Sequence, residues 1–111
     1  MRTIAYNKLV RDRIREIIAG RGAKAITRTL DDEKFGAFLR VKLLEEVQEV
    51  MSAATRRELI TEIADVLEVV RALADLAGIR LEEIETAMRE RAASRGISSQ
   101  RLLLVETREA T

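Results

Sequence analysis

The feature that most constrains this chain is a short capped turn between two stretches of helical periodicity. Thr55, followed three residues later by Glu58, forms a T-x-x-E capping box, so one helix ends near Ala54 and the next begins near Arg56. A connection this short joins antiparallel neighbours. The sequence therefore predicts an antiparallel helical hairpin.

Each helix of this hairpin carries an acidic pair at matching positions. At about 100° per residue, Glu46 and Glu62 fall in the middle of the apolar stripes of their helices. Glu49 and Asp65 each lie roughly 60° to one side, at the edge of the stripe. A carboxylate in an apolar stripe is costly unless it is neutralised, hydrogen-bonded or bound to a cation.

The four acids are expected to meet, because all stand roughly 12 Å from the turn at about 1.5 Å per residue. Converging carboxylates suit a hard cation, and Mg²⁺ is favoured because it binds through carboxylates and substrate phosphates, with Mn²⁺ as a substitute. The chain contains no His and no Cys, which argues against zinc. The alternative is that the acids form surface ion pairs with Lys42, Arg56, Arg57 or Arg71.

Composition limits the class of protein. With 47% hydrophobic and 35% charged residues and no proline, the 111 residues predict one globular, mostly helical domain spanning residues 1–111. A net charge of +1 gives no reason to expect nucleic acid or a membrane as partner. No apolar run resembles a secretory signal, so we expect a cytoplasmic protein. A thin hairpin leaves apolar surface uncovered, which predicts a homodimer or homotetramer.

The rest of the chain predicts two more helices and two short strands. Helical spacing extends from Asn7 to Gly20 and from Leu81 to Arg95. Alternating side chains predict strands at residues 24–30 and 101–105. The expected fold class is all-α, an antiparallel hairpin completing a four-helix-bundle-like core with short peripheral β segments.

The order of these motifs resembles the MazG-like superfamily of all-α nucleoside triphosphate pyrophosphohydrolases. The E-E-x-x-E of residues 45–49, followed by the E-x-x-D of residues 62–65, resembles the metal motif of that superfamily. The Y-N-K-L-V-R-D of residues 6–12 and the I-T-R-T-L-D-D of residues 26–32 narrow the resemblance to its small phosphoribosyl-ATP pyrophosphohydrolase-like branch.

The resemblance implies Mg²⁺-dependent hydrolysis of a nucleoside triphosphate between its α and β phosphates, in a house-cleaning role. It implies metal ligands at Glu46, Glu49, Glu62 and Asp65, and catalytic roles for Glu46 and for Glu45, which would orient water. Phosphate and substrate contacts are implied for Lys8, Arg11, Arg28 and Arg95, with Asp12 orienting Arg11.

Two other functions are compatible with the same residues. One is a pyrophosphohydrolase acting on phosphoribosyl-ATP itself. The other is a non-catalytic helical interaction module that keeps a metal-binding core for structure. Related chains carry Arg-Gly-Gly-Phe where this one has Arg95-Gly96-Ile97-Ser98, so substrate choice is expected to differ if that loop holds the base.

Overall fold

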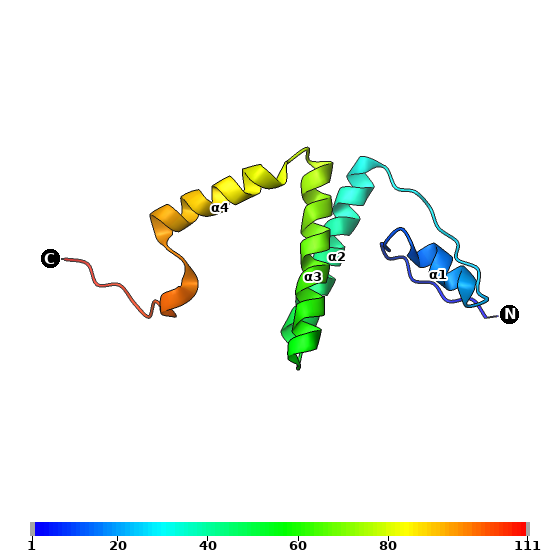
Figure 1. Cartoon of the computed structure of the whole chain (residues 1–111), viewed down its shortest axis with the longest axis horizontal. Helices are drawn as coiled ribbons and strands as arrows, with labels where there is room; N and C mark the ends of the chain where they lie inside the picture. The colour runs from blue at the N-terminus through cyan, green and yellow to red at the C-terminus, as the bar shows by residue number, and fades with distance from the viewer. Residues whose placement is uncertain (1, 111) are drawn as a thin grey trace. The chain divides into compact units, whose positions relative to one another are not determined.

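A computed structural model describes residues 2–110, and within them the regular elements are all helical (Figure 1). By its contacts the chain divides into two units, Met1–Gly78 and Ile79–Thr111. The all-α class is confirmed, whereas a single domain stays a prediction. The elements are α1 (Ile14–Gly20), α2 (Asp32–Ser52), α3 (Arg56–Leu76), α4 (Leu81–Arg95) and the short 3₁₀ helix η1 (Ser98–Gln100).

Helices α2 and α3 form the predicted antiparallel hairpin, lying side by side in Figure 1. The Thr55 hydroxyl accepts a hydrogen bond from the Glu58 N–H at 3.1 Å, and the Glu58 carboxylate accepts one from the Ala54 N–H at 2.9 Å. Asp31 caps the start of α2 by accepting from the Lys34 N–H at 2.8 Å. Side chains that accept hydrogen bonds from the free N–H groups of the first turn stabilise a helix start at that position.

The seam between α2 and α3 is narrow. Leu39 and Val69 are the buried apolar side chains of the described residues, at 2% and 1% exposure. Gly36 is buried beside them, and a Cβ at this position would lie 3.3 Å from Leu76 Cδ2. The missing side chain therefore lets α3 approach α2 closely at the open end of the hairpin.

The first helix is shorter than expected. Asn7 was predicted to cap it, but α1 begins at Ile14, and Asn7 lies in a left-handed conformation with φ +47°. The Lys42 ammonium donates to the Leu9 carbonyl at 3.2 Å, so that oxygen is bonded to α2 and not to an N–H one turn further along a helix. The segment before α1 is thus tied to the hairpin.

The two predicted strands are wrong. Residues 24–30 and 101–105 lie in the described part of the chain and contain no strand. Alternating β-branched side chains do not make a strand without a neighbouring strand to share backbone hydrogen bonds. Arg15 contacts the first of these segments, with its guanidinium donating to the Thr27 hydroxyl at 3.3 Å.

The second unit contains α4, whose predicted bounds are confirmed. The Glu83 carboxylate accepts from the Arg80 N–H at 2.8 Å at its start, and Gly96 ends it with φ +79°. Among the described residues, no helix is long and apolar enough to cross a membrane. The hairpin supplies two helices of the expected four-helix core, and its completion stays a prediction.

Candidate metal centre

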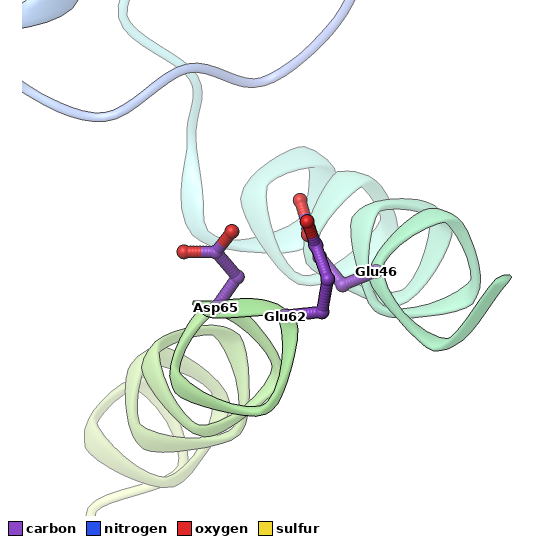
Figure 2. Close-up of side chains that lie close together, drawn as sticks. All are labelled: Glu46, Glu62 and Asp65. Atoms are coloured by element: carbon purple, nitrogen blue, oxygen red, sulfur yellow. The ribbon is translucent and has the colours of Figure 1, made fainter. Parts of the chain in front are cut away.

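Three carboxylates of the hairpin converge on one side of the helix pair. Glu46 of α2 and Glu62 and Asp65 of α3 each offer an oxygen within 4.8 Å of the others, and all three are partly buried. Figure 2 shows their side chains pointing toward the same side of the two helices. We call these three residues the acidic triad.

The position of the turn places Glu46 level with Glu62, with Asp65 and Glu49 on opposite sides of that level. In an antiparallel pair that bends at residue 54, positions whose numbers add to about 108 lie level with each other. Glu46 and Glu62 satisfy this relation, while Asp65 lies almost one turn toward the open end and Glu49 almost one turn toward the bend. Glu49 instead lines a shallow pocket of about 160 Å³ with Glu58 and Glu62.

A cation from the N-terminal segment reaches the triad. The Arg11 guanidinium donates to the Asp65 carboxylate at 2.8 Å, across 54 positions of sequence. Both side chains are partly exposed, so solvent screens this pair. The alternative reading had been that the acids form surface ion pairs with other cations. Within residues 2–110 the ion pairs of the structure do not involve Lys42, Arg56, Arg57 or Arg71.

The electrostatics of the triad centre on Glu62. Partial burial raises the pKa of its carboxyl above the ordinary value, and the negative charges of Asp65, Glu49, Glu46 and Glu58 raise it further. Each neighbouring carboxylate disfavours a second charge close by. A bound cation would reverse this effect by stabilising the charged form.

The donor set fits a hard divalent cation. Ligand oxygens around Mg²⁺ lie about 2.1 Å from the ion, so two of them are at most about 4.2 Å apart. The triad oxygens, within 4.8 Å of one another, need only side-chain adjustments of well under 1 Å to reach such a separation. Three carboxylates, in a chain without His or Cys, match the preference of Mg²⁺ or Mn²⁺.

A larger pocket of about 480 Å³ lies where the N-terminal segment meets the hairpin. Arg11, Asp12 and Lys42 contribute charged groups to its lining, and Phe35 and Leu39 contribute apolar surface. Arg11 belongs both to this pocket and to the ion pair with the triad. The sequence indicated Lys42 only as a possible surface partner of the acids. Lys42 lies one turn before Glu46, and this spacing could have indicated that its side chain lies near the site.

Four further predicted site residues stay predictions. Lys8 and Arg28 are exposed, in the irregular segments before α1 and before α2. Glu45 is exposed on α2, next to Glu46 in sequence. Arg95 is the last residue of α4, in the second unit.

Comparison with known proteins identifies the family. The phosphoribosyl-ATP pyrophosphohydrolase family model matches residues 9–92, which include both hairpin helices and the triad. An uncharacterized protein of Mycolicibacterium smegmatis is 49% identical over 49 residues, which are 44% of this chain and 50% of that relative. The chain thus spans about half the length of this curated relative, and no solved structure matches it. The chain belongs to the phosphoribosyl-ATP pyrophosphohydrolase family, within the MazG-like all-α superfamily of pyrophosphohydrolases.

Proposed function

We propose that this protein is a Mg²⁺-dependent nucleoside triphosphate pyrophosphohydrolase with a house-cleaning role in the cytoplasm. Water attacks at the α phosphate, the α–β phosphoanhydride bond breaks, and the products are the nucleoside monophosphate and pyrophosphate. The observation that carries the proposal is the acidic triad with the Arg11 guanidinium already bound to one of its members.

The triad would hold the cation. Glu46, Glu62 and Asp65 would supply one oxygen each. The pKa of Glu62 is raised because negative charges surround it with no cation to offset them, and a bound metal ion would provide that positive charge. A bound Mg²⁺ supplies Lewis acidity and positive charge against the phosphate oxygens. Glu49, one turn nearer the bend, and Glu45 remain candidates for a further ligand and for orienting water.

Arg11 would change partner during the reaction. In the structure its guanidinium satisfies Asp65, which a cation would do instead once bound. Because Arg11 also lines the pocket of about 480 Å³, its freed N–H groups would face a phosphate placed beside the triad. Offsetting charge on the departing pyrophosphate is a recognised means of lowering the barrier. Lys42 supports this role by fixing the Leu9 carbonyl, two residues before Arg11.

Phosphoribosyl-ATP is the second candidate substrate, because the family model that matches the chain carries its name. Hydrolysis of that substrate also releases pyrophosphate, so the triad would serve it equally well. A non-catalytic helical module is the remaining alternative, and it predicts metal binding that is indifferent to every nucleotide.

The experiment is pyrophosphate release from a panel of canonical, deoxy and modified nucleoside triphosphates, with phosphoribosyl-ATP included. Each substrate is measured with Mg²⁺, with Mn²⁺ and with chelator. Glu46→Gln is the test variant, and Glu33→Gln in the first turn of α2 is the matched control, about 20 Å along the same helix.

Metal-dependent release from a triphosphate that Glu46→Gln abolishes and Glu33→Gln preserves would support the proposal. Release from phosphoribosyl-ATP alone would transfer the function to the second candidate. No release from any substrate, with metal still bound at the triad, would leave the non-catalytic module.

A further inference from the structure

Positive charge is unevenly distributed along this chain. Residues 2–28 contain eight lysines and arginines against two acids, a net charge of +6, whereas residues 29–111 contain twelve against seventeen, a net charge of −5. We call residues 2–28 the basic segment. Its cations are Arg2, Lys8, Arg11, Arg13, Arg15, Arg21, Lys24 and Arg28. The overall charge of +1 is therefore the balance of two oppositely charged parts.

Most of these cations have no carboxylate partner. All eight are exposed. The Arg11 guanidinium lies 2.8 Å from the Asp65 carboxylate, and the Arg13 guanidinium lies 3.7 Å from that of Glu16. Within the part of the chain that the structure describes, the other six form no ion pair. Carboxylates of the same chain therefore leave most of the positive charge of the segment uncompensated.

Two contacts hold the basic segment beside the metal centre. The Arg11 guanidinium donates to Asp65 of the triad, and the Lys42 ammonium of α2 donates to the Leu9 carbonyl at 3.2 Å. Arg11 and Arg13 also line the pocket of about 480 Å³. The pocket and the triad therefore lie beside a concentration of positive charge.

One row of α1 extends this charge beyond the pocket. Ile14 and Ile17 of α1 line the pocket, and Arg21 follows Ile17 by four residues, on the same side and one turn further on. Arg21 is not among the pocket residues. At about 1.5 Å per residue it stands about 6 Å beyond Ile17, which is inside the Debye length of about 8 Å at physiological salt. Its charge therefore acts on the pocket from outside it.

The hairpin alone would repel a polyphosphate. Glu46, Glu62 and Asp65 bring up to three negative charges together, and Glu49 and Glu58 line the neighbouring pocket with Glu62. One divalent cation offsets only two of these charges. A triphosphate that approaches this side therefore meets net negative charge unless cations outside the triad compensate for it.

We propose that the basic segment attracts polyphosphate anions to the metal centre through cations that do not touch the bound anion, Arg21 and Lys24 among them. Sites surrounded by charge of one sign raise the association rate of an oppositely charged ligand by about 10–10³-fold, and salt weakens this effect. The inference rests on the proposed function, because the polyphosphate is the triphosphate of the substrate. Its test measures binding without turnover, so that the two can fail separately.

A short anion suits the segment better than a nucleic acid does. Proteins that bind single strands stack the bases on aromatic side chains, and Tyr6 is the single aromatic residue of the segment. Affinity for a long strand also grows with the number of phosphates that cations neutralise. Residues 29–111, with their net negative charge, add no attraction for the rest of such a strand.

The test is the affinity of the full chain for inorganic tripolyphosphate with Mg²⁺, measured by calorimetry. Arg21→Gln/Lys24→Gln is expected to weaken binding several-fold at about 0.01 M salt, where the Debye length is about 30 Å. The difference from the wild type should disappear at about 1 M salt, where that length is about 3 Å. The matched control is Arg91→Gln/Arg101→Gln in the second unit, which removes the same charge and should bind like the wild type.

A charge-conserving exchange separates attraction from contact. Arg21→Lys/Lys24→Arg keeps both charges with a different hydrogen-bonding geometry, and it should bind like the wild type at both salt concentrations. Weakening by this exchange, or equal weakening of the glutamine variant at both salt concentrations, would mean that the side chains contact the anion. Equal weakening by Arg91→Gln/Arg101→Gln would mean that net charge alone matters. Either result overturns the proposal.

Three other outcomes are equally decisive. Unchanged affinity of the glutamine variant, or no binding of tripolyphosphate to the wild type, overturns the proposal. A single-stranded oligonucleotide that binds the wild type more tightly than tripolyphosphate, and loses this affinity in the glutamine variant, would make the segment a nucleic-acid site. Salt-dependent binding that follows the expected pattern in a chain without pyrophosphate release would keep this inference and reject the catalytic one.

Discussion

The two faces of the α2–α3 hairpin are built from the same two helices and differ in one respect. On the triad side the apolar spacing is interrupted by Glu46 and Glu62 at its centre, whereas the opposite face exposes apolar side chains such as Leu44 on α2 and Ile63 on α3. The two glutamates lower the stability of the hairpin, because their like charges repel each other where apolar contacts would otherwise hold α2 against α3.

The two faces also differ in the groups that they offer to a ligand. The triad side offers oxygen donors, the cation of Arg11 and a pocket, which suit a small charged ligand. The opposite face offers exposed apolar area instead, including Leu44 and Ile63.

The largest expected effect comes from a change that both faces share. Leu39→Ala removes a buried side chain from the seam and should cost about 2–5 kcal/mol of unfolding free energy. Thermal and denaturant unfolding measure it, with Leu103→Ala as the exposed control. A loss of unfolding free energy below about 1 kcal/mol would show that the seam contributes little to holding α2 against α3.

A smaller effect should be confined to the triad side. Asp65→Asn is expected to lower metal-dependent pyrophosphate release by at least about 100-fold, because even a residue that only orients a metal ligand often costs 10–100-fold. The solution mass should not change. Asp75→Asn, near the end of the same helix, is the matched control and should keep its activity. An equal loss in both variants would remove Asp65 from the site.

Arg11 should separate metal binding from turnover. Arg11→Gln removes a partly exposed ion pair worth about 0.2–1 kcal/mol, so metal should bind up to about fivefold more tightly by calorimetry. Turnover should fall by at least about tenfold if the same guanidinium contacts phosphate. Weaker metal binding in this variant would contradict the exchange of partners on Asp65.

The smallest effect concerns the stability of the metal-free protein. In chelator, Glu62→Gln should leave the melting temperature unchanged or raise it, because it removes a charge that its neighbours oppose. The raised pKa of Glu62 determines how the stability of the metal-free protein changes with pH. The penalty of the ionised carboxyl is fully present above its folded pKa, and it disappears as pH falls toward the ordinary value of about 4.3.

The advantage of the glutamine variant should therefore shrink on acidification. Mg²⁺ should stabilise the wild type and not the variant, which shows that the same side chain binds the ion. A variant that melts well below the wild type in chelator would indicate that Glu62 is a structural partner.

Sequence reasoning succeeded where the determinants are local. The Thr55–Glu58 capping box fixes the turn, and the turn with helical spacing brings Glu46 and Glu62 level. The four acids were expected at one level, however, and counting from the bend puts Glu49 and Asp65 on opposite sides of the level of Glu46 and Glu62. Because each lies three residues from that level, the count does not show which of them joins the other two.

Other features depend on distant parts of the chain and could not be read locally. The pair of Arg11 with Asp65 joins residues 54 positions apart, and the bond from Lys42 to the Leu9 carbonyl joins residues 33 positions apart. The predicted strands failed for the same reason. Residues 24–30 have the right side chains, but a strand exists only with a neighbour that alternation in one segment cannot supply.

The turn at residues 53–55 has a consequence for how this chain can vary. Substitutions there are tolerable if Thr55 and Glu58 keep their reciprocal hydrogen bonds. A single inserted residue that extended α3 backward would instead rotate that helix by about 100° and advance it by about 1.5 Å. Glu62 and Asp65 would then leave the side of the hairpin occupied by Glu46. The chain should therefore tolerate the insertion of one residue in this turn far less well than the substitution of one residue.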